Sequence, residues 1–176
     1  MGQPITILNG SALPDSTMYP IARTLESTFS TRVLMENTRL DLSLAYDPLR
    51  RQTNSTALLA QVLAGPKDAS GKKIAIVDVD LFIPILTFVF GEAQLKGTAA
   101  IVSTHRLADQ YYGLPRNDEL MIVRLQKELV HELGHTYGLY HCHYFECVMR
   151  TSVSVEEIDL KSVRLCPKCS EALMRP

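Results

Sequence analysis

The densest group of residues that could do chemistry lies in the stretch HELGHTYGLYH at positions 131–141. If this stretch is helical, His131 and His135 lie one turn apart on the same face, so both imidazoles can bind one metal ion. Glu132 is rotated by about 100° from His131 on the helical wheel. It therefore cannot easily join the same ligand set, but it can reach a water molecule on the metal. The spacing predicts a metal site with a carboxylate beside it.

A third ligand becomes available because a glycine follows the two histidines. If the helix continued, His141 would lie out of reach of the same ion. A positive φ at Gly138 lets the chain turn sharply and bring His141 back beneath the metal. Three neutral imidazoles leave one coordination position for water, which is the arrangement of a catalytic zinc site. Paired histidines alone occur by chance in many proteins, but Gly138 and His141 at these offsets argue against chance.

A long helix is predicted to carry the first two histidines. Asp118 can cap this helix, which runs to about Tyr137 and ends at Gly138. An apolar stripe roughly opposite the histidines can pack against a sheet: Ile122, Leu125, Leu129 and Leu133. Arg124 and Glu128 fall near the ligand face, where we expect each to be solvated or ion-paired.

The remaining candidate ligands are the four cysteines: Cys142, Cys147, Cys166 and Cys169. Two of them form a CxxC pair, and two close pairs of thiolates are typical of a closed, tetrahedral structural zinc site. A disulfide is the first alternative, which a reducing compartment disfavours, and a redox-active CxxC is the second, which a position near the C-terminus disfavours. His143 could replace one cysteine. Because Cys142 directly follows His141, a metal here would also hold the third histidine in place.

The first half of the chain alternates strand and helix signals. Strands are expected at 5–8, 33–35, 73–78, 86–90 and 98–103, and helices at 18–29 and 55–64, the second ending near Gly65-Pro66. One more helix is expected to start at Ser154, whose spacing to Glu157 forms a capping box. This alternation predicts an α/β fold with a mixed, mostly parallel sheet packed on helices.

Length and charge narrow the class of protein further. A chain of 176 residues with 46 % hydrophobic residues fits one domain, 1–176, with the sheet and its helices in 1–117 and the long helix and cysteines in 118–176. The formal net charge of −1 argues against nucleic acid as the main partner. The first ten residues show no secretory signal, and the most apolar segment, 74–90, contains two aspartates and a proline. We therefore expect a cytoplasmic monomer with reduced cysteines that does not bind membranes.

Together with its continuation, the histidine stretch resembles the archaemetzincins, a family of metzincin zinc peptidases. The signature HExxHxxGxxH fills positions 131–141, and Cys142, Cys147, Met149 and the final CxxC follow in the order of that family. Sixteen residues separate Met149 from Cys166, one fewer than in the family pattern. The segments 47–52 (DPLRRQ) and 54–56 (NST) also look like that family.

The resemblance implies a single metzincin-like domain with two zinc ions, one catalytic and one structural. It assigns His131, His135 and His141 to the catalytic zinc, and Cys142, Cys147, Cys166 and Cys169 to the structural zinc. It further implies Glu132 as general base and Met149 in a turn beneath the metal, as a support and not as a ligand. Some metzincins carry a tyrosine ligand two residues after this methionine, but Thr151 occupies that position here. An edge strand above the helix would hold an extended substrate, and residues 86–92 are our candidate.

We therefore expect a zinc-dependent peptidase that acts on peptides or proteins through a metal-activated water, with Glu132 as general base. The alternative is a catalytically weak or silent, zinc-stabilised peptide-binding protein, which would use the same ligands. A zinc-ribbon module for nucleic acid, built on the cysteines, is a third class that the near-neutral charge disfavours.

Overall fold

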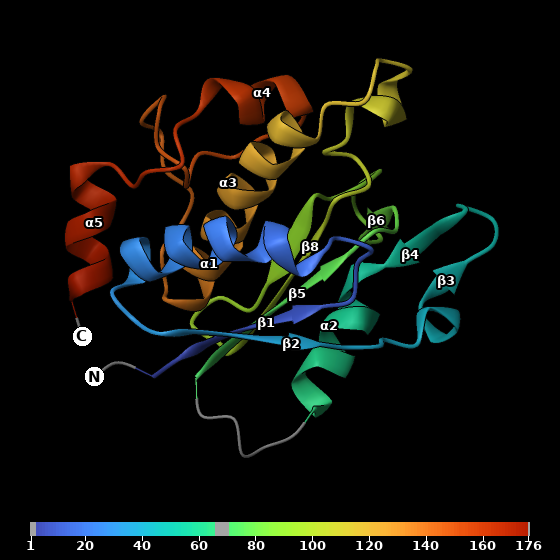
Figure 1. The fold of residues 1–176 in the computed structure, drawn as a ribbon, viewed down its shortest axis with the longest axis horizontal. Helices are drawn as coiled ribbons and strands as arrows, with labels where there is room; N and C mark the ends of the chain where they lie inside the picture. Colours follow the sequence, from blue (N-terminus) through green and yellow to red (C-terminus); the bar gives the residue numbers. More distant parts are fainter. Residues whose placement is uncertain (1–2, 66–70, 176) are drawn as a thin grey trace.

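A five-stranded, mostly parallel sheet forms the centre of the computed structural model, which describes residues 3–65 and 71–175 (Figure 1). The strands follow the order β2-β1-β5-β8-β7, in which only the pair of β7 with β8 is antiparallel. Their bounds are β1 Ile5–Asn9, β2 Val33–Asn37, β5 Lys72–Val77, β7 Gly91–Ala93 and β8 Ala99–Ser103. The predicted α/β class with a mixed, mostly parallel sheet is confirmed.

The inner strands are apolar because both faces of the sheet are covered. All five residues of β8 are buried, as are the last four of β5. Such continuous apolar runs are expected of parallel strands with helices on both sides. The helices are α1 Asp15–Phe29 and α3 Asp118–Thr136 on one face, and α2 Ser55–Ala64 on the other.

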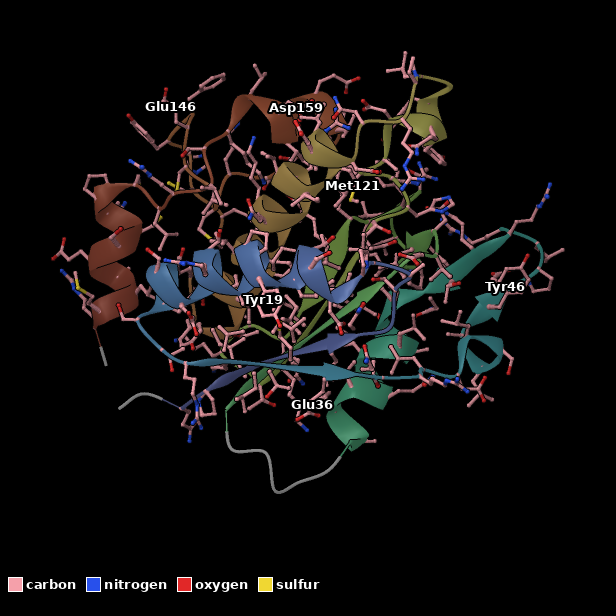
Figure 2. All side chains as sticks on the ribbon, viewed as in Figure 1. Tyr19, Glu36, Tyr46, Met121, Glu146 and Asp159 are labelled. Carbon is pink, nitrogen blue, oxygen red and sulfur yellow. The ribbon has the colours of Figure 1, made fainter. Side chains whose placement is uncertain are left out.

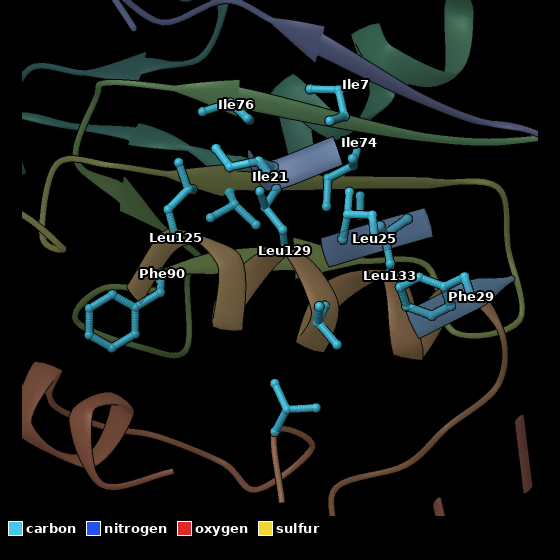
Figure 3. Packing of buried hydrophobic residues seen from close by; sticks show 14 of the residues in the cluster. Ile7, Ile21, Leu25, Phe29, Ile74, Ile76, Phe90, Leu125, Leu129 and Leu133 are labelled. Atoms are coloured by element: carbon cyan, nitrogen blue, oxygen red, sulfur yellow. The ribbon is translucent and has the colours of Figure 1, made fainter. Parts of the chain in front are cut away.

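The core that positions α3 lies between this helix, α1 and the sheet (Figure 3). Leu125, Leu129 and Leu133 of the predicted stripe are fully buried there, and Ile122 packs partly against them. From α1, Ile21 and Leu25 enter the same cluster. Burying a leucine side chain contributes about 1.5–3 kcal/mol, so this stripe fixes the rotation of α3 about its axis.

A small second sheet extends beyond the central one. Its strands are β3 Tyr46–Asp47, β4 Gln52–Asn54 and β6 Leu81–Phe82, in the order β3-β4-β6. Two short 3-10 helices, Leu42–Leu44 and Asp109–Tyr112, lie in the connections.

The residues that follow α3 pack against it from the side away from the sheet. It contains α4 Val155–Leu160 and α5 Pro167–Met174. Arg124 of α3 forms ion pairs of 2.7 Å with Asp159 and 2.6 Å with Asp109, and Figure 2 shows Asp159 beside the first turns of α3. Lys127 donates hydrogen bonds to the carbonyls of Ile158 and Asp159, at the end of α4.

Several predicted elements need correction. Residues 86–90 are not a strand, apart from one isolated bridge of Val89 to Leu81, and the edge strand begins only at Gly91. Asn117, and not Asp118, caps α3, because its side chain accepts from Leu120 N. Ser154 is the residue before α4, but its side chain makes no cap, and Glu157 accepts from Val153 N and not from Ser154 N, so the predicted capping box is absent.

Two further details concern helix ends and membranes. The CxxC opens a helix that was not predicted, α5, with Pro167 in its first turn. Helix α2 ends at Ala64 with Gly65 after it, and Pro66 lies outside the described residues. Among residues 3–65 and 71–175, no helix is long and apolar enough to cross a membrane.

Candidate active site

The end of α3 is shaped by a glycine that turns the chain. Gly138 has a φ of +91°, its N–H donates to His135 O, and Leu139 N donates to Gly134 O. This is a Schellman motif, in which a left-handed residue closes the helix and satisfies its last carbonyls. The predicted turn after the second histidine is therefore present, and the chain returns toward the helix at His141.

The three histidines meet at one point. Their potential ligand atoms all lie within 4.8 Å of one another, and Nε2 of His131 and Nε2 of His135 are 3.1 Å apart. Nδ1 of His131 lies 2.8 Å from Val148 O, and Nδ1 of His135 lies 2.8 Å from Leu139 O. Because a carbonyl can only accept, each Nδ1 carries the proton and each Nε2 offers its lone pair to the common point. This donor set fits a metal ion such as zinc.

Burial keeps the imidazoles neutral, which is the form that binds metal. It is the largest cause that lowers the pKa of His131 well below 6.5, and partial desolvation also lowers the pKa of half-buried His135 and of the more exposed His141. The positive charge of Lys161 acts in the same direction on all three. A protonated imidazole cannot coordinate, so these surroundings favour the ligand state.

Glu132 is buried next to the histidines and contributes to the same cavity. Burial raises the pKa of Glu132 well above 4.5, Glu128 and Glu92 raise it further, and Lys161 opposes them. The edge strand approaches this side chain closely at Gly91, where a Cβ atom would lie 2.8 Å from Glu132 Cγ and 2.6 Å from Ile101 O. Only glycine at position 91 allows this approach, a requirement that the sequence reading missed.

Met149 is fully buried and packs against Gly134 of α3. A Cβ atom at Gly134 would stand 2.5 Å from its sulfur, so the glycine inside the HELGH stretch makes room for the methionine. The neighbouring Val148 provides the carbonyl that holds His131, and Met149 O accepts from Cys142 N at 2.9 Å. The methionine segment therefore orients the first histidine and the residue after the third.

The four cysteines also come together, as free thiols with potential ligand atoms within 4.8 Å of one another. Backbone N–H groups point at two of the sulfurs, with Tyr144 N 3.4 Å from Cys142 Sγ and Cys166 N 3.4 Å from Cys147 Sγ. Such donors stabilise thiolates, so this donor set also fits zinc. The pKa of Cys166 falls to about 7, because hydrogen bonds from Cys169 and the other cysteines outweigh its desolvation. His143 is exposed and does not belong to the cluster.

A cavity of about 400 Å³ opens in front of the histidines. One wall is formed by residues 86–91 and Ala93, the other by Thr151, Ser152 and Val153, and α3 lies at its floor. The irregular segment 86–90 is held by side chains: Arg50 donates to the carbonyls of Leu86 and Thr87, and Gln52 donates to Thr87 O and Asp80. Residues of the DPLRRQ segment therefore shape the cleft.

Glu92 anchors the edge strand from the other face of the sheet. Its carboxylate accepts hydrogen bonds from the hydroxyls of Ser55 and Thr56, in the first turn of α2. A carboxylate at the start of a helix also interacts favourably with the helix dipole. Through this contact the NST segment, at the start of α2, is linked to the edge strand beside the cleft, although α2 covers the opposite face of the sheet.

Sequence reasoning did not single out Lys161, which is completely buried. Its Nζ lies 2.9 Å from Glu128 Oε1 and 3.2 Å from Arg150 O. It thus joins α3 to the residue after Met149. Glu128 and Arg124 are both buried and ion-paired, which is one of the two states expected for them. No spacing rule could have found Lys161, because 33 positions separate it from Glu128.

The layered fold and the histidine geometry place the molecule among the zinc metallopeptidases of the metzincin type. Residues 67–175 match peptidase family M54. The archaemetzincin of Thermococcus kodakarensis is 38% identical over 169 residues, which cover 93% of this chain and 91% of that protein. The chain therefore belongs to the archaemetzincins, and it is a zinc metallopeptidase that acts on peptide or protein substrates.

Solved structures agree with this assignment. The crystal structure of archaemetzincin from Methanopyrus kandleri has a TM-score of 0.86 at 34% identity, covering 98% of this chain and 94% of that chain. A zinc-dependent peptidase from Methanocorpusculum labreanum has a TM-score of 0.86 at 29% identity, covering 96% of this chain and 99% of that chain.

Proposed function

We propose that the protein hydrolyses peptide bonds in the cleft between β7 and residues 151–153, with zinc on His131, His135 and His141 and with Glu132 as general base. One observation carries the proposal. The carboxylate of Glu132 is buried in the wall of the cavity onto which the three histidines open. A general base must lie within hydrogen-bond reach of the proton that it removes, and the shared cavity supports this role for Glu132.

When bound, zinc supplies Lewis-acid chemistry, because it lowers the pKa of a water molecule and polarises a carbonyl group. Glu132 accepts the proton of the attacking water and later donates it to the leaving amine. The carbonyls of Val148 and Leu139 hold His131 and His135 in one tautomer and one orientation. Met149 packs against α3 at Gly134, between the two helical histidines in the sequence, and so supports this part of the helix.

The edge strand offers a place for the substrate backbone. Phe90 O and Gln94 N are bonded to β8, so by strand alternation the backbone groups of Gly91 and Ala93 point away from the sheet. An extended peptide can pair with these groups and lie across the histidines. The strand that serves this purpose is thus shorter than the segment 86–92 proposed from the sequence.

We also propose a second, structural zinc on Cys142, Cys147, Cys166 and Cys169. Four thiolates would complete a tetrahedral ion and leave no position for water. Support comes from the clustered sulfur atoms and from the N–H groups directed at two of them. Since Cys142 follows His141 directly and bonds to Met149 O, the ion would stabilise the turn that carries the third histidine.

A peptide-library digest with wild type and Glu132→Gln tests the proposal. We expect two zinc ions per chain in both proteins by elemental analysis, and cleavage that is slower by about 10²–10⁴ in the variant. Glu119→Gln is the matched control, because Glu119 is an exposed acid on the same helix. Equal cleavage by Glu132→Gln would exclude this base. Binding of peptides without turnover by the wild type would instead favour the silent binding protein.

A further inference from the structure

The turn between β7 and β8, residues 94–98, lies against the C-terminal end of α3. Lys96 N in this turn donates to His135 O at 2.9 Å. The Lys96 side chain also covers the helix end, because a Cβ atom at Gly138 would lie 3.1 Å from Lys96 Cγ. The edge strand is therefore attached, through its turn, to the part of the helix that carries the second histidine.

The Lys72 side chain joins this turn to both the helix and the sheet. Lys72 is the first residue of β5, and its Nζ donates to Gly97 O at 2.7 Å and to Thr136 O at 2.9 Å. The same ammonium group lies 4.9 Å from the centre of the Tyr137 ring. Thr136 is the last residue of α3, and the last carbonyls of a helix have no partner within it. Lys72 supplies a donor to one of them and places a positive charge at the negative end of the helix dipole.

The two ends of β7 are held by different contacts. At the start of the strand, Gly91 packs against Glu132 so closely that no Cβ atom fits between them. Beyond its end, Lys72 and Lys96 hold the following turn on α3. Removing the ammonium group of Lys72 is therefore expected to loosen the end at Ala93 and to leave the packing at Gly91 in place.

Strand direction tells which part of a substrate meets the end at Ala93. The chain runs from Gly91, beside Glu132, along α3 to Lys96, beside His135. Antiparallel pairing is the more stable kind for an added strand, and an antiparallel peptide runs the opposite way. Because Glu132 is the proposed base, the cleaved bond lies near Gly91. Residues before this bond then pair at Ala93, and residues after it lie along the segment that precedes Gly91.

We propose that Lys72 is a positioning residue for peptide cleavage, because it holds the turn 94–98 on α3 and so keeps β7 in place for the substrate residues before the cleaved bond. Lys72 does not line the cavity, so it acts through the backbone of the edge strand. This inference rests on the proposed peptidase function and deepens it by assigning the recognition of one side of the substrate to one lysine.

The test varies the length of the substrate on one side only. Two peptides share the cleaved bond and all residues after it, and they carry either one or four residues before it. The N–H and C=O groups of Ala93 can form two hydrogen bonds with the longer peptide, so its kcat/KM in the wild type is expected to be about tenfold higher. In Lys72→Met, which keeps the aliphatic stem without the donors, this ratio is expected to fall toward one.

Two further variants separate positioning from general stability. Lys72→Arg keeps a charged donor at this position and is expected to retain most of the gain from length. The matched control is Lys73→Met, because Lys73 follows in the same strand and points to the opposite face of the sheet. There its Nζ lies 3.8 Å from the position of a Cβ atom at Gly65. This control is expected to keep the wild-type ratio.

Two readouts need no turnover. Hydrogen exchange of the backbone in residues 94–98 is expected to be faster in Lys72→Met than in the wild type and in Lys73→Met. Peptides that end in a hydroxamate, a group that binds zinc, place all their residues on the side before the cleaved bond. The zinc-loaded wild type is expected to bind the four-residue hydroxamate about tenfold more tightly than the one-residue form, and Lys72→Met is expected to bind the two about equally.

The ratio between long and short peptides decides the outcome. If Lys72→Met slows both peptides equally, or slows neither, the gain from length does not depend on Lys72 and the inference is overturned. The same holds if Lys73→Met loses the gain as fully as Lys72→Met. If the wild type cleaves neither peptide, the proposed function fails, while the hydroxamate affinities still decide the role of Lys72.

Discussion

The two clusters of candidate ligands lie next to each other in the chain but differ in what they leave open. The histidines change from buried His131 through half-buried His135 to exposed His141, and a cavity lies in front of them. Three of the four cysteines are buried, and the fourth is half-buried. Three imidazoles leave one coordination position and four thiolates leave none. The number of ligands thus distinguishes the proposed catalytic site from the proposed structural site.

The two clusters are also held differently. Backbone carbonyls contact two of the histidines through their Nδ1 atoms: Val148 O, next to Met149, orients His131, and Leu139 O orients His135. Two of the cysteines receive backbone N–H groups, Cys142 from Tyr144 and Cys147 from Cys166. Because Cys142 is joined to both clusters, disturbing the cysteines is expected to disturb the histidines, whereas the reverse effect is expected to be small.

The largest effect is expected from removing the cysteine cluster. Cys166→Ser/Cys169→Ser should lose one zinc per chain, lower the melting temperature strongly and abolish cleavage, because structural zinc contributes about 10 kcal/mol or more in small zinc modules. His135→Ala should also lose one zinc and all cleavage but should melt close to the wild type. Elemental analysis, thermal unfolding and the peptide digest measure the three properties. Equal melting temperatures of the two variants would contradict the proposed division of roles.

The next largest effect is expected from breaking the buried ion pair of Lys161 with Glu128, which lies beside the histidine cluster. Lys161→Met leaves Glu128 without its counter-charge and Arg150 O without its donor. Breaking a buried ion pair by removing one partner costs about 3–5 kcal/mol, so chemical denaturation should show a loss of this size in the free energy of unfolding. Adding Glu128→Gln should recover much of it. If the double variant is as unstable as the single one, the pair does not act as an ion pair.

The sequence predicted those features that depend on neighbours in the chain. Helix α2 has its predicted bounds because the Asn54 side chain caps it and Gly65 follows it. The HExxH spacing and Gly138 specified the histidine geometry for the same reason, since helix period and one positive φ are local properties. The apolar stripe of α3 likewise predicted which face meets the sheet.

Features that depend on distant parts of the chain were missed or wrong. Residues 86–90 are rich in strand-forming types, yet Arg50 and Gln52 hold this backbone in place of a neighbouring strand. The pairing of Lys161 with Glu128 and the space for Met149 at Gly134 exist only once α4 and the methionine segment pack on α3. The start of helix α5 had a local signal, because proline is common in the first turn of a helix and Pro167 follows Cys166. The prediction treated this segment only as a pair of metal ligands.

A smaller effect is expected at two glycines with positive φ, where backbone strain can be distinguished from the positioning of a metal ligand. Gly138 and Gly113 both have positive φ, +91° and +75°, and a Cβ atom would lie 3.1 Å from Lys96 Cγ at the first but meet nothing within 4 Å at the second. Alanine in the left-handed region costs about 1–2 kcal/mol. Both Gly→Ala variants should therefore lose similar stability. Only Gly138→Ala should also lose zinc affinity and cleavage, because Gly138 forms the turn that leads to His141. Equal cleavage by the two variants would show that the turn does not position the third histidine.

The smallest effect concerns the wall of the cleft and depends on pH. Burial opposes the charge of Asp80, but hydrogen bonds from Arg106 and Gln52 and the positive charge of Arg106 outweigh it, so the pKa of Asp80 lies below 3.8. A carboxylate whose pKa is lowered in the folded protein stabilises it above the unfolded pKa, and this contribution is lost as the pH falls through the folded pKa. Asp80→Asn should therefore lower the free energy of unfolding by about 1 kcal/mol at pH 7, and the difference from wild type should shrink below about pH 4.

Asp80→Asn also tests whether the cleft wall formed by residues 86–91 supports substrate binding without supporting the metal sites. Gln52 joins Asp80 to the Thr87 carbonyl, and Arg106 lies over the Phe88 ring. Loosening this network should raise KM for peptides more than it lowers kcat, and both zinc ions should remain bound, because no cysteine or histidine ligand contacts it in the described residues. Asp118→Asn is the matched control, since Asp118 forms an ion pair with Arg116 at the exposed start of α3. Loss of zinc from Asp80→Asn, with KM unchanged, would show that the wall supports the metal sites and not the substrate.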